Sequence, residues 1–310
     1  MKIAVTGGSG FIGGWLCQTA AIMSHQLVVI GRNDCMPTRH ATTQPIDYRQ
    51  TDYTPPSLTE AFRGCDAVVH LAAARFSDNM RWDLYTENIT SSWAVLEACR
   101  NCSISNIVML SSRSVYSSMN NLPWEESQRP IPINLYGAAK AAVENLADTY
   151  IAAHGLCVKS LRVADTFGYG ERDGYMLTTF IKQAHAGETL HFYGNDASRR
   201  EYVYVKDVAG AIMAALAKPD LSGIFNIGSG CTITSLALAE MINRIFLNPS
   251  GIVTRPNATE RLENNQMSVH KASELLNWRR AWTLEEALRD AREIMTRHST
   301  AIDLQVSKTV

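Results

Sequence analysis

The chain has 310 residues, of which 46% are hydrophobic and 19% are charged, and its formal net charge is −1. These values are typical of a globular protein with a large core, and they exclude a broad basic surface for nucleic acid. No apolar run reaches the ~18 residues of a membrane span, and the N-terminus enters a strand without a charged and apolar leader. The 7 cysteines are irregularly spaced, which favours reduced thiols and a cytoplasmic location.

A glycine-rich turn follows the first apolar segment. Residues 2–6 predict a buried strand, and the apolar spacing from Phe11 onward predicts a helix. Between them lies the pattern G-x-x-G-x-x-G, formed by Gly7, Gly10 and Gly13. A turn of this kind lets backbone N–H groups approach a pyrophosphate at the helix N-terminus. We interpret it as a dinucleotide-binding turn, with an ordinary turn between strand and helix as the alternative.

The end of the second expected strand bears on the choice of cofactor. Residues 26–30 are mostly apolar, and Gly31 and Arg32 follow where an NAD-binding unit usually has an acidic residue for the ribose hydroxyls. A guanidinium can pair with a 2′-phosphate, and the missing carboxylate removes a repulsion. The pattern therefore favours NADP over NAD. Two observations leave NAD open: Asp34 lies close by, and Arg32 also fits a solvated loop charge.

Strands and helices then alternate up to about residue 112. Two apolar runs predict strands over residues 66–70 and 107–111, and a long helix is expected between them over 85–100. This alternation predicts a parallel, doubly wound sheet. We interpret His70 as a hydrogen-bonded core histidine rather than a catalytic one.

A serine, a tyrosine and a lysine predict acid–base chemistry. Tyr136 and Lys140 are four residues apart and share one face of a helix for which Asn134 is the expected N-cap. A nearby ammonium lowers the pKa of a phenol from its ordinary value near ~10, so the pair can exchange protons with a carbinol or carbonyl. Ser112, at the end of a strand, can donate to the same oxygen. Two surface residues and a capping serine are the alternative.

After residue 162 the pattern changes to short strands mixed with helices. We therefore expect an α/β protein with a Rossmann-type doubly wound parallel sheet and a smaller mixed C-terminal lobe for the substrate. The expected boundaries are an NAD(P)-binding domain over 1–164 with returning segments near 203–230, a substrate-binding lobe over 165–298, and a loose tail over 299–310.

The chain resembles the extended short-chain dehydrogenases/reductases, in particular the NAD(P)-dependent sugar-nucleotide epimerase/dehydratase family. The resemblance covers about residues 1–295. It rests on the glycine turn, on the serine, tyrosine and lysine, and on further matching segments: 66–73, Asn88, 111–116, 161–162, 200–207, 226–230 and 276–286.

The resemblance implies a role for each matching residue. The cofactor pyrophosphate would be held by Gly7, Gly10, Phe11, Ile12 and Gly13. Its adenosine end would contact Arg32, Asp52 and Tyr53, and the rest of it would be lined by Leu71, Ala72, Ala73 and Asn88. Tyr136 would be the acid/base, Ser112 would bind the reacting oxygen, and Lys140 would hold the nicotinamide ribose and lower the pKa of Tyr136. The substrate would contact Ser112, Ser114, Asp165 and Arg200.

The family pattern also carries expectations about partners. Arg200 would lie against the diphosphate of a nucleotide-linked sugar. Asp165, where relatives often have Asn, would repel that diphosphate unless it is paired or faces away. The helices at 85–100 and 135–153 would form a homodimer interface, and neither a metal, a nucleic acid nor a membrane is expected.

Departures from the family pattern narrow the expected activity. Dehydratases carry an Asp-Glu pair after the Ser/Thr, where this chain has Arg113 and Ser114, so dehydration is not expected. The leading hypothesis is an NADP-dependent reductase/dehydrogenase of a nucleotide-activated sugar, a 4-keto-6-deoxy hexose, with Tyr136 supplying the proton. The alternative is an NDP-sugar 4-epimerase with tightly bound NAD, and a third interpretation is a non-catalytic NADP-sensing regulator.

Overall fold

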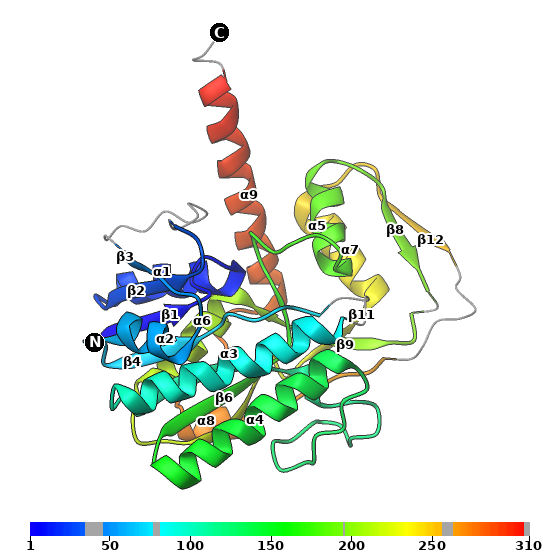
Figure 1. Ribbon diagram of the computed structural model, residues 1–310. Coiled ribbons are helices and arrows are strands. Elements are labelled where there is room, and N and C mark those ends of the chain that lie inside the picture. Colours follow the sequence, from blue (N-terminus) through cyan, green and yellow to red (C-terminus); the bar gives the residue numbers. More distant parts are fainter. Residues whose placement is uncertain (35–45, 77–80, 195, 256–262, 307–310) are drawn as a thin grey trace.

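A seven-stranded parallel sheet forms the centre of the protein in the computed structural model, which describes residues 1–34, 46–76, 81–194, 196–255 and 263–306 (Figure 1). Its strand order is β10-β6-β5-β4-β1-β2-β3. The bounds are β1 (Lys2–Thr6), β2 (Gln26–Gly31), β3 (Asp47–Gln50), β4 (Ala67–His70), β5 (Asn106–Ser112), β6 (Cys157–Val163) and β10 (Gly223–Ile227). The chain runs outward from β1 to β3 and then crosses back to β4, so the carboxyl ends of β1 and β4 mark the switch point where such sheets bind ligands.

Helices cover both faces of this sheet, which explains the apolar runs in its central strands β1, β2 and β4. Along β1, Ile3 and Val5 enter one core and Ala4 enters the other. The first core is closed by α1 (Phe11–Ile22), α6 (Val205–Leu216) and α8 (His270–Leu275). The second is closed by α2 (Pro55–Phe62), α3 (Trp82–Asn101) and α4 (Leu135–His154).

A smaller lobe stands beside the carboxyl edge of the sheet. It contains a mixed three-stranded sheet, β11-β9-β7, and a parallel pair, β8 and β12. The strands are β7 (Asp165–Phe167), β8 (Leu190–Tyr193), β9 (Arg199–Tyr204), β11 (Thr232–Thr234) and β12 (Ile252–Arg255). Its core lies among α5 (Met176–His185), α7 (Ser235–Phe246) and the first part of α9 (Leu284–Val306). The predicted α/β class with a smaller mixed lobe is confirmed.

Two local expectations differ from the structure. Helix α9 continues through Val306 and projects from the body in Figure 1, where the sequence predicted a loose tail from residue 299; residues 307–310 lie outside the described residues. Ion pairs four residues apart support the helix, such as Glu285 with Arg289 at 2.6 Å. The sequence also predicts a third strand that ends at Asp52 and Tyr53. Strand β3 instead ends at Gln50, and Tyr53 has a φ of +64°, which a strand cannot accommodate.

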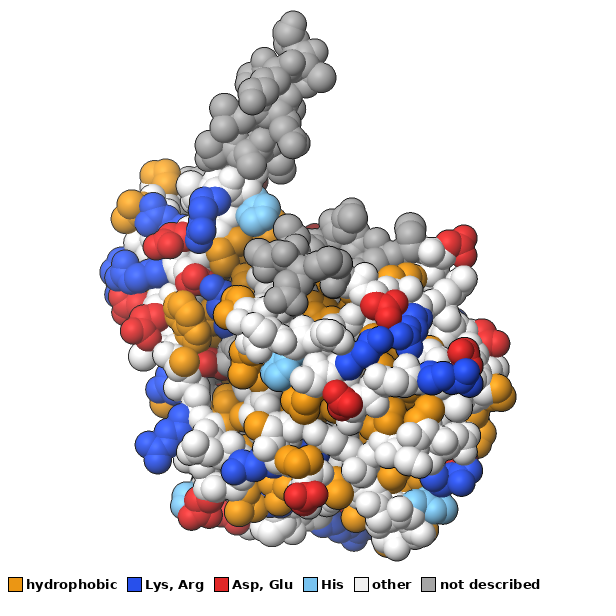
Figure 2. Space-filling model, turned by 90° about the vertical axis from the view of Figure 1, so that its left-hand side faces the viewer, with side chains coloured by type: hydrophobic (Ala, Val, Ile, Leu, Met, Phe, Trp, Pro, Cys, Tyr) orange, Lys and Arg blue, Asp and Glu red, His pale blue; other side chains and the backbone are white. Residues whose placement is uncertain are grey.

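Charges of both signs are interspersed on the face that carries the N-terminus. Figure 2 shows this face, where Lys, Arg, Asp and Glu side chains separate the hydrophobic ones. Among the described residues, no helix is both long and apolar enough to span a membrane.

Candidate active site

The glycine turn lies between the carboxyl end of β1 and the start of α1. Gly7 has a φ of +72°, and a Cβ there would come 2.7 Å from the backbone nitrogen of Ala72, so only glycine lets the turn pass this close to the end of β4. Gly10 occupies the cap position of α1, and Phe11 and Ile12 begin the helix. The first N–H groups of α1 therefore stay open to an anion, and the turn fits the pyrophosphate of a dinucleotide.

The adenosine side of this site holds a carboxylate that the sequence did not reveal. Arg32 lies over the ring of Tyr53, with 4.9 Å from the guanidinium carbon to the ring centre, and forms an ion pair with Glu87 of α3. Glu87 thus brings a further acidic group to the end of β2, where Asp34 is the acidic residue nearest in the sequence. Asp52 accepts hydrogen bonds from the backbone and hydroxyl of Thr54, which hold the pKa of its carboxyl below the usual value.

The segment after β4 lies beside the glycine turn and includes Leu71, Ala72 and Ala73. The backbone N–H of Leu71 donates to the carbonyl of Thr6 at 3.1 Å, which ties this segment to β1. Asn88 uses both groups of its amide on Ala74, accepting at 2.6 Å and donating at 2.9 Å. Asn88 therefore positions the segment, and its contact with the cofactor stays a prediction.

Ser112, Tyr136 and Lys140 are brought together by the packing of α4 on the end of β5. Asn134 caps α4 as expected, accepting from the backbone of Gly137 at 2.8 Å. A Cβ at Gly137 would lie 2.0 Å from the carbonyl oxygen of Ser114, so glycine permits the close approach. The Ser112 hydroxyl lies close enough to Tyr136 to affect the pKa of its phenol, and the Lys140 ammonium lies 5.8 Å from the centre of the Tyr136 ring.

Burial controls the protonation of this group. It raises the pKa of Tyr136 to about 12, against the opposing effects of the Ser112 hydrogen bond and the positive charge of Arg75. Burial also lowers the pKa of Lys140 to about 8, and the ammonium donates to the carbonyl of Leu110 at 2.7 Å. The expected lowering of the Tyr136 pKa by Lys140 is therefore not found, because spacing along a helix says nothing about desolvation.

Arg75 and Arg172 form a clasp between the two lobes beside Tyr136, which the sequence patterns did not predict. Arg75, after β4, pairs with Glu171 of the smaller lobe, while Arg172 donates to the carbonyl of Phe76 at 2.6 Å. Both guanidinium carbons lie 5.4 Å from the centre of the Tyr175 ring. The Phe76 ring meets the Tyr136 ring edge-on at 6.4 Å. The clasp joins the two lobes next to the reacting hydroxyl.

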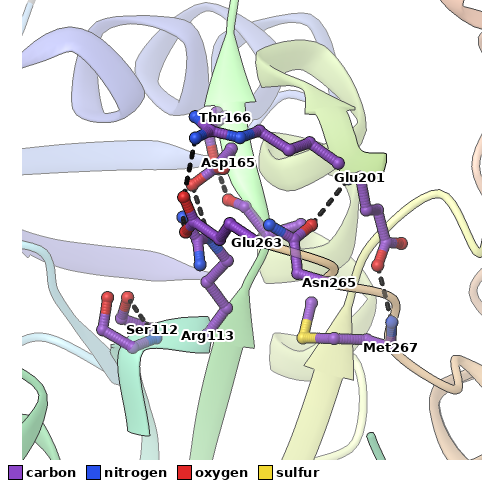
Figure 3. Close-up of polar contacts among 11 residues, drawn as sticks. Ser112, Arg113, Asp165, Thr166, Glu201, Glu263, Asn265 and Met267 are labelled. Atoms are coloured by element: carbon purple, nitrogen blue, oxygen red, sulfur yellow. Dashed lines mark hydrogen bonds and ion pairs between the residues drawn. The ribbon is translucent and has the colours of Figure 1, made fainter. Parts of the chain in front are cut away.

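A second group of charges lies on the substrate side of Ser112 (Figure 3). Arg113 donates to Asp165 at 2.6 Å and to Glu263 at 3.3 Å, and Arg200 donates to the other oxygen of Glu263 at 2.7 Å. Burial lowers the pKa of Arg113, but the two carboxylates outweigh it and the net shift is upward. Asp165, whose charge was expected to repel a phosphate, is thus paired. Ser114 donates its backbone N–H to the Ser112 hydroxyl at 3.1 Å.

His70 is not part of the catalytic group. It is buried, with Thr6 at 2.7 Å from one ring nitrogen and Ser92 at 3.1 Å from the other. These contacts confirm its interpretation as a hydrogen-bonded core histidine.

A glycine turn at the switch point of a parallel sheet, with Ser, Tyr and Lys side chains gathered beside it, defines a nicotinamide-dependent oxidoreductase of the short-chain type. The sequence model of the NAD dependent epimerase/dehydratase family matches residues 3–228. The chain belongs to this family, and its cofactor is accordingly a nicotinamide dinucleotide.

Relatives and solved structures agree with this assignment. The uncharacterized UDP-glucose epimerase YtcB of Bacillus subtilis strain 168 is 28% identical over 304 residues, covering 93% of this chain and 96% of the relative. The crystal structure of the UDP-N-acetylglucosamine 4-epimerase from Bacillus cereus is similar with a TM-score of 0.87 and 33% identity, covering 96% of each chain. The UDP-glucose 4-epimerase of Thermotoga maritima, solved with UDP-glucose, gives a TM-score of 0.86 at 25% identity and covers 96% of this chain and 99% of that one.

Proposed function

We propose that this protein is a nucleotide-sugar 4-epimerase that retains NAD through the catalytic cycle. The observation that carries the proposal is the convergence of Ser112, Tyr136 and Lys140 beside the glycine turn. An epimerase and a reductase both use this arrangement. Two observations favour the epimerase: the similar proteins named as 4-epimerases, and the pairing of Arg32 with Glu87, which occupies the guanidinium expected to bind a 2′-phosphate.

The residues of this chain have distinct parts in the reaction. Held at the turn of Gly7, Gly10 and Gly13, NAD would supply reversible hydride transfer at C4 of the sugar. Tyr136 takes the proton of the C4 hydroxyl as the carbonyl forms and returns it when the hydroxyl is restored. Ser112 donates a hydrogen bond to the same oxygen, and the charge of Arg75 favours the phenolate of Tyr136.

The exposed tryptophans and the free thiols bear on the assembly and the location of the protein. Helices α3 and α4 lie side by side on the outside of the sheet, and Trp82 and Trp93 of α3 are 54% and 41% exposed (Figure 1). We expect these helices to pair with a second copy in a homodimer, which light scattering after gel filtration would measure. The six cysteines that the structure describes are free thiols, which suits a cytoplasmic protein.

Turnover without added cofactor tests the proposal. Purified protein is incubated with UDP-N-acetylglucosamine or UDP-glucose, and the C4 epimers are separated by chromatography. The expected result is interconversion with no NAD supplied, and a kcat that falls by roughly 10²- to 10⁴-fold in Tyr136→Phe. Tyr136→Phe should keep the wild-type melting temperature and its bound nicotinamide. Stoichiometric consumption of NADPH with a 4-keto-6-deoxy sugar nucleotide would instead establish the reductase.

A further inference from the structure

One carboxylate bridges two arginines on the substrate side of the active site. Glu263 accepts from Arg113 through one oxygen, at 3.3 Å, and from Arg200 through the other, at 2.7 Å. Arg113 follows Ser112 directly, so this cluster adjoins the hydroxyl expected to hold the reacting oxygen. Figure 3 shows the Arg113, Asp165 and Glu263 side chains converging, although they come from three separate segments.

Glu263 leaves part of the hydrogen-bonding capacity of the Arg200 guanidinium unused. Its Nη2 donates to Glu263, but its Nε is buried and has no hydrogen-bond partner among the described residues. Nε and Nη2 form the edge of a guanidinium that matches two oxygens of a phosphate or carboxylate. Glu263 accepts only from Nη2, so the Nε of Arg200 is left for the second oxygen of a phosphate or carboxylate.

Hydrogen bonds hold the backbone of Glu263 and of the residues that follow it, so the Glu263 side chain can leave without moving them. The backbone N–H of Glu263 donates to the Ser198 hydroxyl at 3.0 Å, and that of Asn265 donates to the carbonyl of Arg199 at 3.0 Å. The Asn265 amide oxygen in turn accepts from the backbone of Glu201 at 2.6 Å. These bonds hold the segment along β9, and the Glu263 side chain is 43% exposed.

The charges of the cluster favour an incoming anion once Glu263 withdraws. Asp165 stays on the Nε of Arg113 at 2.6 Å and neutralises one of the two arginines. With Glu263 in place the four groups sum to zero, and without it they carry one net positive charge. The free Nη2 of Arg113 and the Nε–Nη2 edge of Arg200 then face the same vacated position.

The family resemblance already implies that Arg200 lies against the diphosphate of the nucleotide sugar; we propose that Arg113 is a second arm of this site, and that Glu263 fills the site until the substrate displaces it. This inference rests on the proposed function for the identity of the anion. It gives Arg113 a substrate-binding role, and it makes Glu263 an internal competitor that sets the affinity for the substrate.

Binding of UDP tests the inference without requiring turnover. Isothermal titration calorimetry at fixed ionic strength would compare wild type with Glu263→Gln, Arg113→Gln and Arg200→Gln. Removing the competing charge in Glu263→Gln should lower the Kd for UDP by about tenfold, because charge-assisted hydrogen bonds are roughly twice as strong as neutral ones. Each arginine variant should raise the Kd by at least about tenfold. Glu274→Gln, which removes the same charge from exposed helix α8, should leave the Kd unchanged.

The outcomes separate this inference from the proposed function. Tighter binding in Glu263→Gln cannot arise from structural damage, so it supports the competition directly. An unchanged or higher Kd in Glu263→Gln, or an unchanged Kd in Arg113→Gln, overturns the inference even if the enzyme epimerises its sugar. UDP binding with the expected changes but without epimerisation would overturn the proposed function and leave the diphosphate site standing. The absence of UDP binding in both wild type and Glu263→Gln would overturn the inference.

Discussion

Arg75 and Glu171 form a bidentate ion pair between the two lobes, with N–O distances of 2.6 and 2.9 Å. The Glu171 side chain is 1% exposed, whereas that of Arg75 is 40% exposed, so a buried carboxylate holds a guanidinium at the edge of the site. The positive charge of Arg75 favours the phenolate of Tyr136 and opposes the effect of burial on its pKa. The pair therefore links the contact between the lobes to the acidity of the Tyr136 phenol.

Replacing Arg75 by Gln should impair the reaction through the protonation of Tyr136. Without the guanidinium the pKa of Tyr136 rises further, so kcat at neutral pH should fall by roughly tenfold, and the rising limb of its pH profile should move to higher pH. The measurement is kcat from pH 6 to 10 on the expected epimerisation, that range being roughly one in which most proteins stay folded.

Arg172→Gln is the matched control for Arg75. Arg172 holds the same clasp through the Phe76 carbonyl and the Tyr175 hydroxyl. Arg172 is not among the charges that shift the pKa of Tyr136 most, so its loss should leave the pH profile of kcat unchanged. If both variants lower kcat with unmoved pH profiles, Arg75 serves only to hold the lobes together.

Glu87 should govern the discrimination between NAD and NADP. Its carboxylate engages Arg32 and would repel a 2′-phosphate, so Glu87→Gln frees the guanidinium for that phosphate. The ratio of the NADPH Kd to the NADH Kd should fall by about tenfold. Fluorescence titration of cofactor-depleted protein measures both values. Glu97→Gln, on the same helix and paired with Arg100, should not change the ratio. A wild-type protein that already prefers NADPH would contradict this account.

The parts of the site that are local in sequence could be predicted, and the parts made by long-range pairing could not. The glycine turn and the helix carrying Tyr136 and Lys140 depend on neighbouring residues, and their patterns predicted their positions. By contrast, Glu87 lies 55 residues from Arg32, and Glu171 lies 96 residues from Arg75. Only the completed fold brings such partners together, and only the fold buries Tyr136 enough to raise its pKa.

His70 should make the protein sensitive to acid. Burial, and to a smaller degree the charge of Lys140, lower the pKa of His70 from 6.5 to about 3. Between these values the unfolded chain binds a proton that the folded chain does not, so stability falls as the pH drops below 6.5. At pH 5 this loss amounts to about 2 kcal/mol, since each pH unit contributes about 1.36 kcal/mol.

Urea unfolding of wild type and His70→Gln at pH 7 and pH 5 measures this contribution. The variant loses the contacts with Thr6 and Ser92 and should be the less stable protein at pH 7. Its deficit should shrink by about 2 kcal/mol at pH 5, because only the wild type has the buried histidine. An equal loss of stability in both proteins would assign the acid sensitivity to other groups.

Removing one partner of the buried ion pair of Arg162 and Glu144 should destabilise the fold, because the other charge then stays buried without its partner. Both side chains are at most 2% exposed, and they meet through two hydrogen bonds of 2.9 and 2.7 Å. Glu144 also accepts from Ser111 on β5, so the pair ties α4 to the strand that ends in Ser112. Arg162→Met or Glu144→Leu alone leaves a buried charge without its partner and should lower the free energy of unfolding by about 3–5 kcal/mol.

The double variant distinguishes an unpaired charge from lost packing. In Arg162→Met/Glu144→Leu no charge of the pair remains buried, so the free energy of unfolding should fall by clearly less than the sum of the two single losses. Urea unfolding of the four proteins closes this cycle. Additive losses would mean that each side chain stabilises the fold through separate contacts, such as that of Arg162 with the Tyr116 hydroxyl at 2.6 Å, rather than through the pair. A double variant that regains stability but not activity would show that the ion pair sets the position of α4, and with it the distance between Ser112 and Tyr136.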